Sequence, residues 1–190
     1  ASDVASLDSV EVVTSGHQIV AEKILSLNPD LIIIDSLSGP SSALATIASA
    51  GIRIVEISEA WKLSEIERKV SEIALAIGAV DDGKNLIAAL QSSKRAVTQI
   101  PAGKTIAFLY LRGGSAVYLI GGKGSGTDSL ISAIGGVDAG AQKFENPFTP
   151  MTAEAVATLN PEVFLVMSKG LESVGGVDGL VQLPGIAQTQ

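Results

Sequence analysis

Several residue types are scarce in this chain of 190 residues, and each scarcity excludes a class of chemistry. The chain has no cysteine, so disulfides, thiolate metal sites and cysteine nucleophiles are excluded, while the redox compartment stays open. Lysine and arginine together number 13 against 20 acidic residues, and the net charge is -7. This balance argues against nucleic acid as a partner, because phosphate binding needs clustered cations. The single histidine, His17, has no acidic residues around it at a metal-ligand spacing.

Long apolar runs are also absent. Mean hydropathy is +0.40, yet no run approaches the roughly 20 residues that a membrane helix needs. We therefore expect a chain that does not itself span a membrane and keeps its apolar residues in short buried strands and alanine-rich helices. No export signal is visible at Ala1, so we expect any such signal to have been removed or to lie outside this sequence.

The most informative feature that is present is a repeat. The stretch AEKILSLNPDLIIID at 21–35 returns as AEAVATLNPEVFLVM at 153–167, an offset of about 132 positions. Each copy predicts a short amphipathic helix, a turn at Asn-Pro and one buried strand, and the proline ends the helix because it lacks an N–H. A unit repeated once predicts two lobes built alike, and the cleft between two lobes is a natural ligand site.

Apolar periodicity and turn residues predict the other elements. Helices are expected at about 18–27 with Ser15 as N-cap, and at 43–50, 63–77, 81–100 and 127–134. Strands are expected at 31–34, 52–57, 104–111 and 117–120, and the segment 138–150 is expected to be irregular. The order strand, helix, strand predicts a parallel crossover. The helix at 81–100 would be about 30 Å long, which suits a rigid connector.

The predicted fold class is α/β, with two Rossmann-like lobes of parallel-stranded sheets joined by one long helix. The first lobe is placed at 1–80, the connecting helix at 81–100 and the second lobe at 101–190. Aligning Gly51 with Gly185 puts the counterpart of the strand at 52–57 where the sequence stops, and almost nothing precedes Val10 in the first lobe. We therefore expect a fragment truncated at both ends.

Two residues that recur with the repeat are candidates for contact with a partner. Glu22 and Glu154 each stand in the first turn of an equivalent helix, where a carboxylate interacts favourably with the helix dipole. That role explains either residue alone. As a matched pair, one on each lobe, they would also form a two-point docking surface for a partner with paired arginines.

The sequence gives weaker support to an enzymatic function. The segment GGKGSG at 121–126 follows a strand and opens a helix, but a phosphate loop needs Gly-Lys-Ser/Thr and Lys123 is followed by Gly124. A GxGxxG fingerprint and a GxSxG elbow are also missing. A flexible turn explains this segment better than a nucleotide site.

Three stretches and a short one near the end carry a resemblance to a known family. They are SGHQIVAEKILSLNPDLIIID, RGGSAVYLIGGKGSGTDSLISAIGGVDAG, PMTAEAVATLNPEVFLVM and LPGIAQT. The chain resembles the substrate-binding proteins of bacterial haem ABC importers, within the wider group that binds siderophores and cobalamin. The resemblance implies two α/β lobes, a single connecting helix at 81–100 and no enzymatic activity. It also implies an extracytoplasmic location, periplasmic or lipid-anchored, and delivery of haem to a membrane permease.

The resemblance also assigns roles to residues. Family members that ligate haem from both lobes use a histidine of the first and a tyrosine of the second, and His17 and Tyr118 occupy the matching positions. Ferric iron accepts a phenolate oxygen and an imidazole as axial ligands. Arg112 and Lys123 are the nearest candidates to bind the propionates. Some members carry an arginine two residues after the tyrosine, where this chain has Ile120.

In the wider group, the glutamates that match Glu22 and Glu154 dock on arginines of the permease. Taken without the resemblance, Tyr118 is explained by ring packing in a strand, and His17 by a structural role. Three alternatives stay open: a siderophore- or cobalamin-binding protein of the same architecture, a nucleotide-using α/β enzyme, and an interaction domain without a small ligand.

Overall fold

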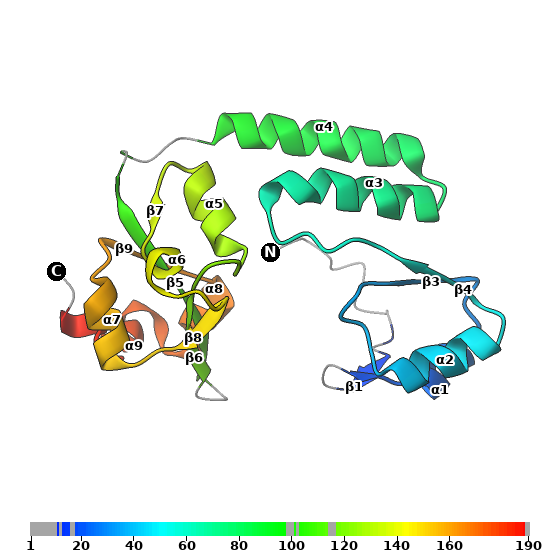
Figure 1. The fold of residues 1–190 in the computed structure, drawn as a ribbon, viewed down its shortest axis with the longest axis horizontal. Coiled ribbons are helices and arrows are strands. Elements are labelled where there is room, and N and C mark those ends of the chain that lie inside the picture. The colour runs from blue at the N-terminus through cyan, green and yellow to red at the C-terminus, as the bar shows by residue number, and fades with distance from the viewer. Residues whose placement is uncertain are drawn as a thin grey trace. The chain divides into compact units, whose positions relative to one another are not determined.

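The computed structural model describes residues 11, 13–15, 18–97, 101, 103–113 and 117–188. The chain divides into two compact units (Figure 1). Unit 1 comprises residues 1–59 and 67–87, and unit 2 comprises residues 60–66 and 88–190. Within the described ranges, no helix is both long and apolar enough to cross a membrane.

Unit 1 is built on a pair of parallel strands. Its elements are β1 (Thr14–Ser15), β2 (Gln18–Ile19), α1 (Ala21–Ser26), β3 (Leu31–Ile34), α2 (Ser41–Ser49), β4 (Arg53–Glu56), most of α3 (Ile66–Ala76) and the first half of α4 (Val80–Ala96). The strand β3 pairs in parallel with β4, and β1 pairs antiparallel with β2. Helices α1 and α2 cover one face of the β3–β4 pair, where Ile24 and Ile47 are buried against Ile32 and Ile54.

Unit 2 is organised around β5 (Thr105–Arg112), whose alternating residues Ala107, Leu109 and Leu111 are buried in one cluster with Ile120. The other strands are β6 (Val117–Gly121), β7 (Val137–Asp138), β8 (Phe148–Pro150) and β9 (Val163–Val166). The helices are α5 (Thr127–Ala133), α6 (Ala139–Lys143), α7 (Ala153–Leu159), α8 (Ser168–Ser173) and α9 (Gly176–Leu180), with short 3-10 turns η2 (Leu63–Glu65) and η4 (Ile186–Gln188).

The sheet of unit 2 is mixed. β5 pairs in parallel with β9, as the sequence predicts for buried strands, and also with the unpredicted short strand β7. It pairs antiparallel with β6, which in turn pairs antiparallel with β8. Only four residues separate β5 from β6. A connection this short allows only antiparallel neighbours, because a parallel crossover needs about a dozen residues or more.

The Asn-Pro turn of the repeat has the same backbone geometry in both units. Asn28 has φ 47° and Asn160 has φ 38°, and they are the only non-glycine residues with positive φ in the described part of the chain. Asparagine tolerates this left-handed conformation better than most residues, and its N–H closes the last helical turn. The proline that follows prevents the helix from continuing. The repeat therefore forms the same corner between a helix and a strand twice in this chain.

Three element predictions are corrected. The helix expected at 18–27 begins at Ala21, because Gln18 and Ile19 form β2 and pair with β1. Ser15 thus lies in a strand, and the N-cap is Val20, which makes no side-chain cap. The long helix begins at Val80 and ends at Ala96, with 98–100 outside the described residues.

The segment expected to be irregular, 138–150, contains α6 between two short strands, β7 and β8. Asp138 starts this helix, since its Oδ1 accepts a hydrogen bond of 2.8 Å from the N–H of Ala141. Elements of two to five residues are too short to show a hydrophobic period.

The left-handed corner predicts a specific pattern of stability. Asn160→Ala should lower the free energy of unfolding by about 1–2 kcal/mol, because the new Cβ is disfavoured at positive φ. Asn160→Gly should be nearly neutral, because glycine adopts this conformation freely. Urea unfolding of the three proteins checks this, and equal losses for alanine and glycine would contradict it.

Asp138 predicts a pH dependence. Burial raises the pKa of its carboxyl above the ordinary value of 3.8, against the opposing hydrogen bonds from Ala141 and Gly140, and Oδ2 is buried without a partner within the described residues. The ionised form is therefore disfavoured in the fold. Stability relative to Asp138→Asn should fall as pH rises from 3.8 through the raised pKa, and stay constant above it. Thermal melts of both proteins from about pH 3 to about pH 7 measure this, and a pH-independent difference would contradict it.

Candidate ligand-binding edges and docking surface

Tyr118 and Arg112 lie at one edge of the unit 2 sheet. Tyr118, near the start of β6, pairs with Leu111, and Arg112 ends β5. Because β6 is antiparallel to β5, its first residues meet the carboxyl end of β5, and the end of the parallel strand β9 lies beside Leu109. Ligands of open α/β sheets bind outside the carboxyl ends of the strands. The structure therefore brings these two predicted residues to the edge where a ligand would bind.

The surroundings of Tyr118 suit a ligand-binding role. The residue is half-buried and packs against the apolar cluster of unit 2, while its backbone carbonyl accepts a 2.9 Å hydrogen bond from Met151. Among the described residues, none makes a hydrogen bond with its hydroxyl group. A ring fixed by packing with an unengaged hydroxyl presents one oxygen in a defined position, which is what an iron ligand requires.

Lys123 is not brought to this edge. It follows the opposite end of β6, and the strand alone separates Tyr118 from Gly121 by about 10 Å at 3.3 Å per residue. The Lys123 Nζ lies 3.1 Å from Glu145 Oε2, so its charge is already paired. Arg112, in contrast, is exposed and makes no ion pair within the described ranges. The geometry favours Arg112 over Lys123 as a partner for an anionic ligand group.

Sequence reasoning missed Lys169. This exposed residue lies in α8, directly after β9, and its neighbour Gly170 packs so closely on the Leu111 carbonyl that a Cβ there would lie 2.9 Å from the oxygen. Lys169 therefore stands on the same edge as Tyr118, and no ion pair of its Nζ is found in the described part of the chain. Its position after the second copy of the repeat was the available signal.

His17 lies outside the described residues. The two strands that flank it in sequence, β1 and β2, are described. The N–H of Ile19 in β2 donates a 2.9 Å hydrogen bond to the carbonyl of Gly39, in the loop that follows β3. In the same loop, Ser38 Oγ donates to Asp35 Oδ1 over 2.8 Å. The β1–β2 pair is thus attached to the carboxyl end of β3, the end at which ligands of open α/β sheets bind.

Two glutamates that come after β4 in the chain, Glu59 and Glu72, accept hydrogen bonds from serine residues. Glu72 accepts hydrogen bonds from the Ser58 N–H at 2.7 Å and the Ser58 Oγ at 2.8 Å, and these bonds lower the pKa of its carboxyl. Glu59 Oε1 accepts a 3.0 Å bond from Ser36 Oγ. In the described ranges, no three histidine or acidic residues gather where they would hold a metal ion.

The glycine-rich loop at 121–126 does not offer a phosphate site. A phosphate loop binds its ligand through free backbone N–H groups. Here four consecutive N–H groups already donate to protein oxygens, at Pro147, Phe144, Asp128 and Gly122. This loop is a closed structural turn, which weighs against the nucleotide hypothesis.

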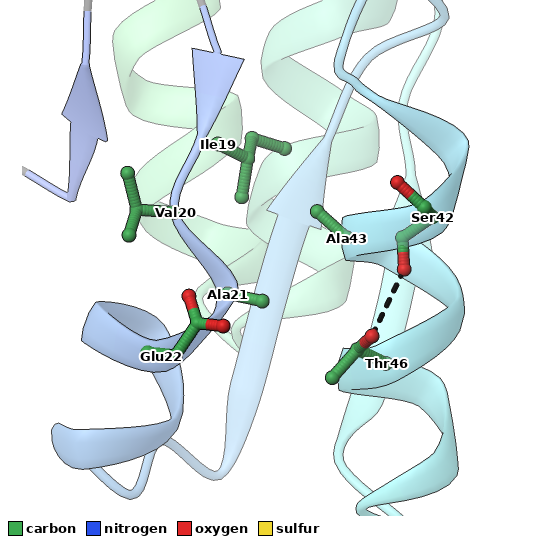
Figure 2. A pocket seen from close by; sticks show the side chains of 7 residues that line it. All are labelled: Ile19, Val20, Ala21, Glu22, Ser42, Ala43 and Thr46. Carbon is green, nitrogen blue, oxygen red and sulfur yellow. Dashed lines mark hydrogen bonds between the residues drawn. The ribbon is translucent and has the colours of Figure 1, made fainter.

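Glu22 and Glu154 occupy the equivalent positions that the repeat predicts, in the first turns of α1 and α7. Both are exposed, and neither carboxylate has an ion pair or hydrogen bond within the part of the chain that the structure describes. Glu22 also lines a surface hollow of about 280 Å³ between α1 and α2 (Figure 2).

The chain is similar to known proteins in both sequence and structure. The family model described as "Periplasmic binding protein" matches residues 1–190. The solved structure of heme binding protein HmuT is 39% identical, with a TM-score of 0.83, and the match covers 97% of this chain and 62% of that chain. The periplasmic heme-binding protein RhuT from Roseiflexus sp. RS-1, in its apo form, is 36% identical with a TM-score of 0.85, over 95% of this chain and 70% of that one.

A curated relative is more distant. An uncharacterized ABC transporter substrate-binding lipoprotein, YvrC of Bacillus subtilis strain 168, is 26% identical over 168 residues, which cover 82% of this chain and 52% of the relative. The chain therefore spans about half the length of this curated relative and under two thirds of HmuT.

The packing of the Tyr118 ring predicts how two substitutions change the stability of the fold. Tyr118→Phe should change the free energy of unfolding by less than about 0.5 kcal/mol, because the hydroxyl makes no hydrogen bond with the described residues and the packed ring is kept. Tyr118→Ala should cost about 2 kcal/mol or more, because it removes the ring from the cluster. Denaturant unfolding measures both changes. A loss above about 1 kcal/mol for Tyr118→Phe would reveal a structural bond to the hydroxyl.

Proposed function

Because the chain belongs to the periplasmic binding protein family, we propose that it is the haem-binding component of an ABC importer. The observation that carries this proposal is the position of Tyr118 near the start of β6, at the carboxyl end of β5, with no hydrogen bond to its hydroxyl among the described residues. The similarity to proteins described as heme-binding supports haem as the ligand. Haem combines an apolar ring, an iron that accepts a phenolate, and two propionates that need cations.

In this proposal Tyr118 supplies the phenolate ligand of the iron. The resemblance assigns the imidazole ligand to His17. Arg112 and Lys169 bind propionates by charge-assisted hydrogen bonds, and the pairing of Lys123 with Glu145 makes Lys123 the weaker candidate. The protein is a carrier with no catalytic residue: haem is cargo, held by coordination and burial and released unchanged.

Delivery uses the two matched carboxylates. Glu22 and Glu154, exposed and unpaired within the described residues, dock on arginines of the membrane permease. The lipoprotein relative and the family description support a location outside the cytoplasmic membrane, either in the periplasm or anchored by lipid at the cell surface.

A hemin titration followed by visible spectroscopy tests the ligand and both iron ligands. The unaltered chain should bind hemin saturably, and His17→Ala and Tyr118→Phe should each change the Soret and charge-transfer bands, because each removes one axial ligand. The matched control is Tyr110→Phe, which alters the only other tyrosine, a residue whose ring packs 6.2 Å from that of Phe148. This control should leave the spectrum unchanged.

Titrations of the same variants with other ligands separate the alternatives. A ferric siderophore supplies its own iron ligands. Siderophore binding that survives both substitutions, without hemin binding, would therefore identify a siderophore as the ligand in place of haem. Saturable binding of ATP or NAD would support the nucleotide hypothesis. Hemin binding that all three variants share equally would contradict the assigned ligands.

A further inference from the structure

Helix α8 is joined to the end of β5 by a side-chain hydrogen bond. Ser173 Oγ accepts a 2.9 Å hydrogen bond from the N–H of Gly113, the residue directly after the strand. The same hydroxyl donates a 2.7 Å hydrogen bond to the Gly170 carbonyl within α8, so its own hydrogen is already used and its lone pairs face outward. Ser173 thus presents an acceptor to Gly113 in a defined position.

Two glycines allow the helix to approach the strand this closely. A Cβ at Gly113 would overlap the backbone carbonyl of Ser173, and a Cβ at Gly170 would lie 2.9 Å from the Leu111 carbonyl oxygen. Both contacts are closer than a Cβ atom tolerates, so glycine is needed at each position. The hydrogen bond and the two glycine contacts together form a unit that we name the α8 clamp, made of Leu111, Gly113, Gly170 and Ser173.

The α8 clamp acts on the hairpin that carries two candidate site residues. Leu111, which Gly170 contacts, pairs with Tyr118 between β5 and β6. Arg112 lies between Leu111 and Gly113, the two strand-end residues that the helix contacts. The backbone positions of Tyr118 and Arg112 therefore depend on where α8 holds the end of β5.

Helix α8 also carries a cation of the proposed site. Lys169 is exposed and directly precedes Gly170, so the clamp that fixes Gly170 on Leu111 also fixes the backbone from which Lys169 extends. A ligand held by one phenolate and by cations needs these groups at a constant spacing, because ordering them at the moment of binding would lower the affinity.

We propose that Ser173 is a positioning residue for haem binding, an inference that rests on the proposed function. Its hydroxyl holds the Gly113 N–H, and through it the hairpin of Tyr118, against the helix that carries Lys169. Removing this hydroxyl frees one backbone N–H and loosens the hairpin, but it removes no group that binds haem in the proposed site. The phenolate then meets the iron in a less defined geometry.

Ser49 provides a matched control. Its Oγ donates a 2.9 Å hydrogen bond to the Ala45 carbonyl within α2, and among the described residues no other bond to this hydroxyl is found. Ser49→Ala therefore removes a bond inside a helix, as Ser173→Ala does, without releasing a strand. Ser173→Thr is the conservative variant, because the residue is exposed and threonine keeps the hydroxyl.

Two measurements on the folded variants test the proposal. Amide hydrogen exchange at Gly113, without hemin, should be about fivefold faster in Ser173→Ala, because that is the protection lost with one ordinary hydrogen bond. A hemin titration should show about fivefold weaker binding for Ser173→Ala, together with a shift of the phenolate-to-iron charge-transfer band. A loss of stability alone would leave that band in place. Ser173→Thr should restore exchange, affinity and band, and Ser49→Ala should change none of them.

The two measurements separate this inference from the proposed function. Unchanged exchange at Gly113 in Ser173→Ala would refute the α8 clamp. Faster exchange with unchanged affinity and an unchanged band, or a band shift that Ser49→Ala shares, would refute the positioning role and leave the haem proposal intact. An unaltered chain that does not bind hemin would overturn the proposed function and the role of Ser173 in it, while the exchange result would still stand for the clamp.

Discussion

The left-handed Asn-Pro corner is the constraint on which both units depend. At Asn28 and at Asn160 the chain leaves a helix of six or seven residues and turns directly into a buried strand. Because the strand runs back along the helix, the start of the helix and the carboxyl end of the strand lie on the same side of the corner. The corner thereby places an exposed glutamate and the carboxyl end of the strand on the same side within each unit. In the proposed function the first docks on the permease and the second lies beside the cargo.

Much of this scaffold follows from the sequence, because several of its strands are continuous apolar runs and several of its helices are bounded by glycine or proline. The strand Leu31–Ile34 has the predicted bounds, and the helix at Thr127–Ala133 differs by one residue from its prediction. The elements that were missed are the short ones. Two-residue strands such as Gln18–Ile19 are defined by their pairing partner, and pairing is a tertiary property that a local pattern does not contain. The antiparallel direction of β6 was available from the short connection after Arg112, yet the parallel pattern of its neighbours outweighed it.

The candidate site was less predictable than the fold. The importance of Tyr118 came from a resemblance, and its packed ring and unengaged hydroxyl are visible only in three dimensions. Lys123 and Lys169 show why the strand direction is needed to place a site residue. Both follow apolar strands, but β6 is antiparallel to β5 whereas β9 is parallel to it, so the two lysines lie at opposite ends of the strands. The glycine-rich loop shows it again, since only the folded chain reveals that its N–H groups already have acceptors.

Coordination of haem iron by a tyrosine of unit 2 is the central claim, and resonance Raman spectroscopy of the hemin-loaded chain tests it most directly. With excitation in the phenolate-to-iron charge-transfer band, the account predicts an iron–phenolate stretching band. That band should disappear in Tyr118→Phe and persist in Tyr110→Phe. A hemin complex of the unaltered chain that lacks this band would contradict the account, because it would show that Tyr118 does not bind the iron.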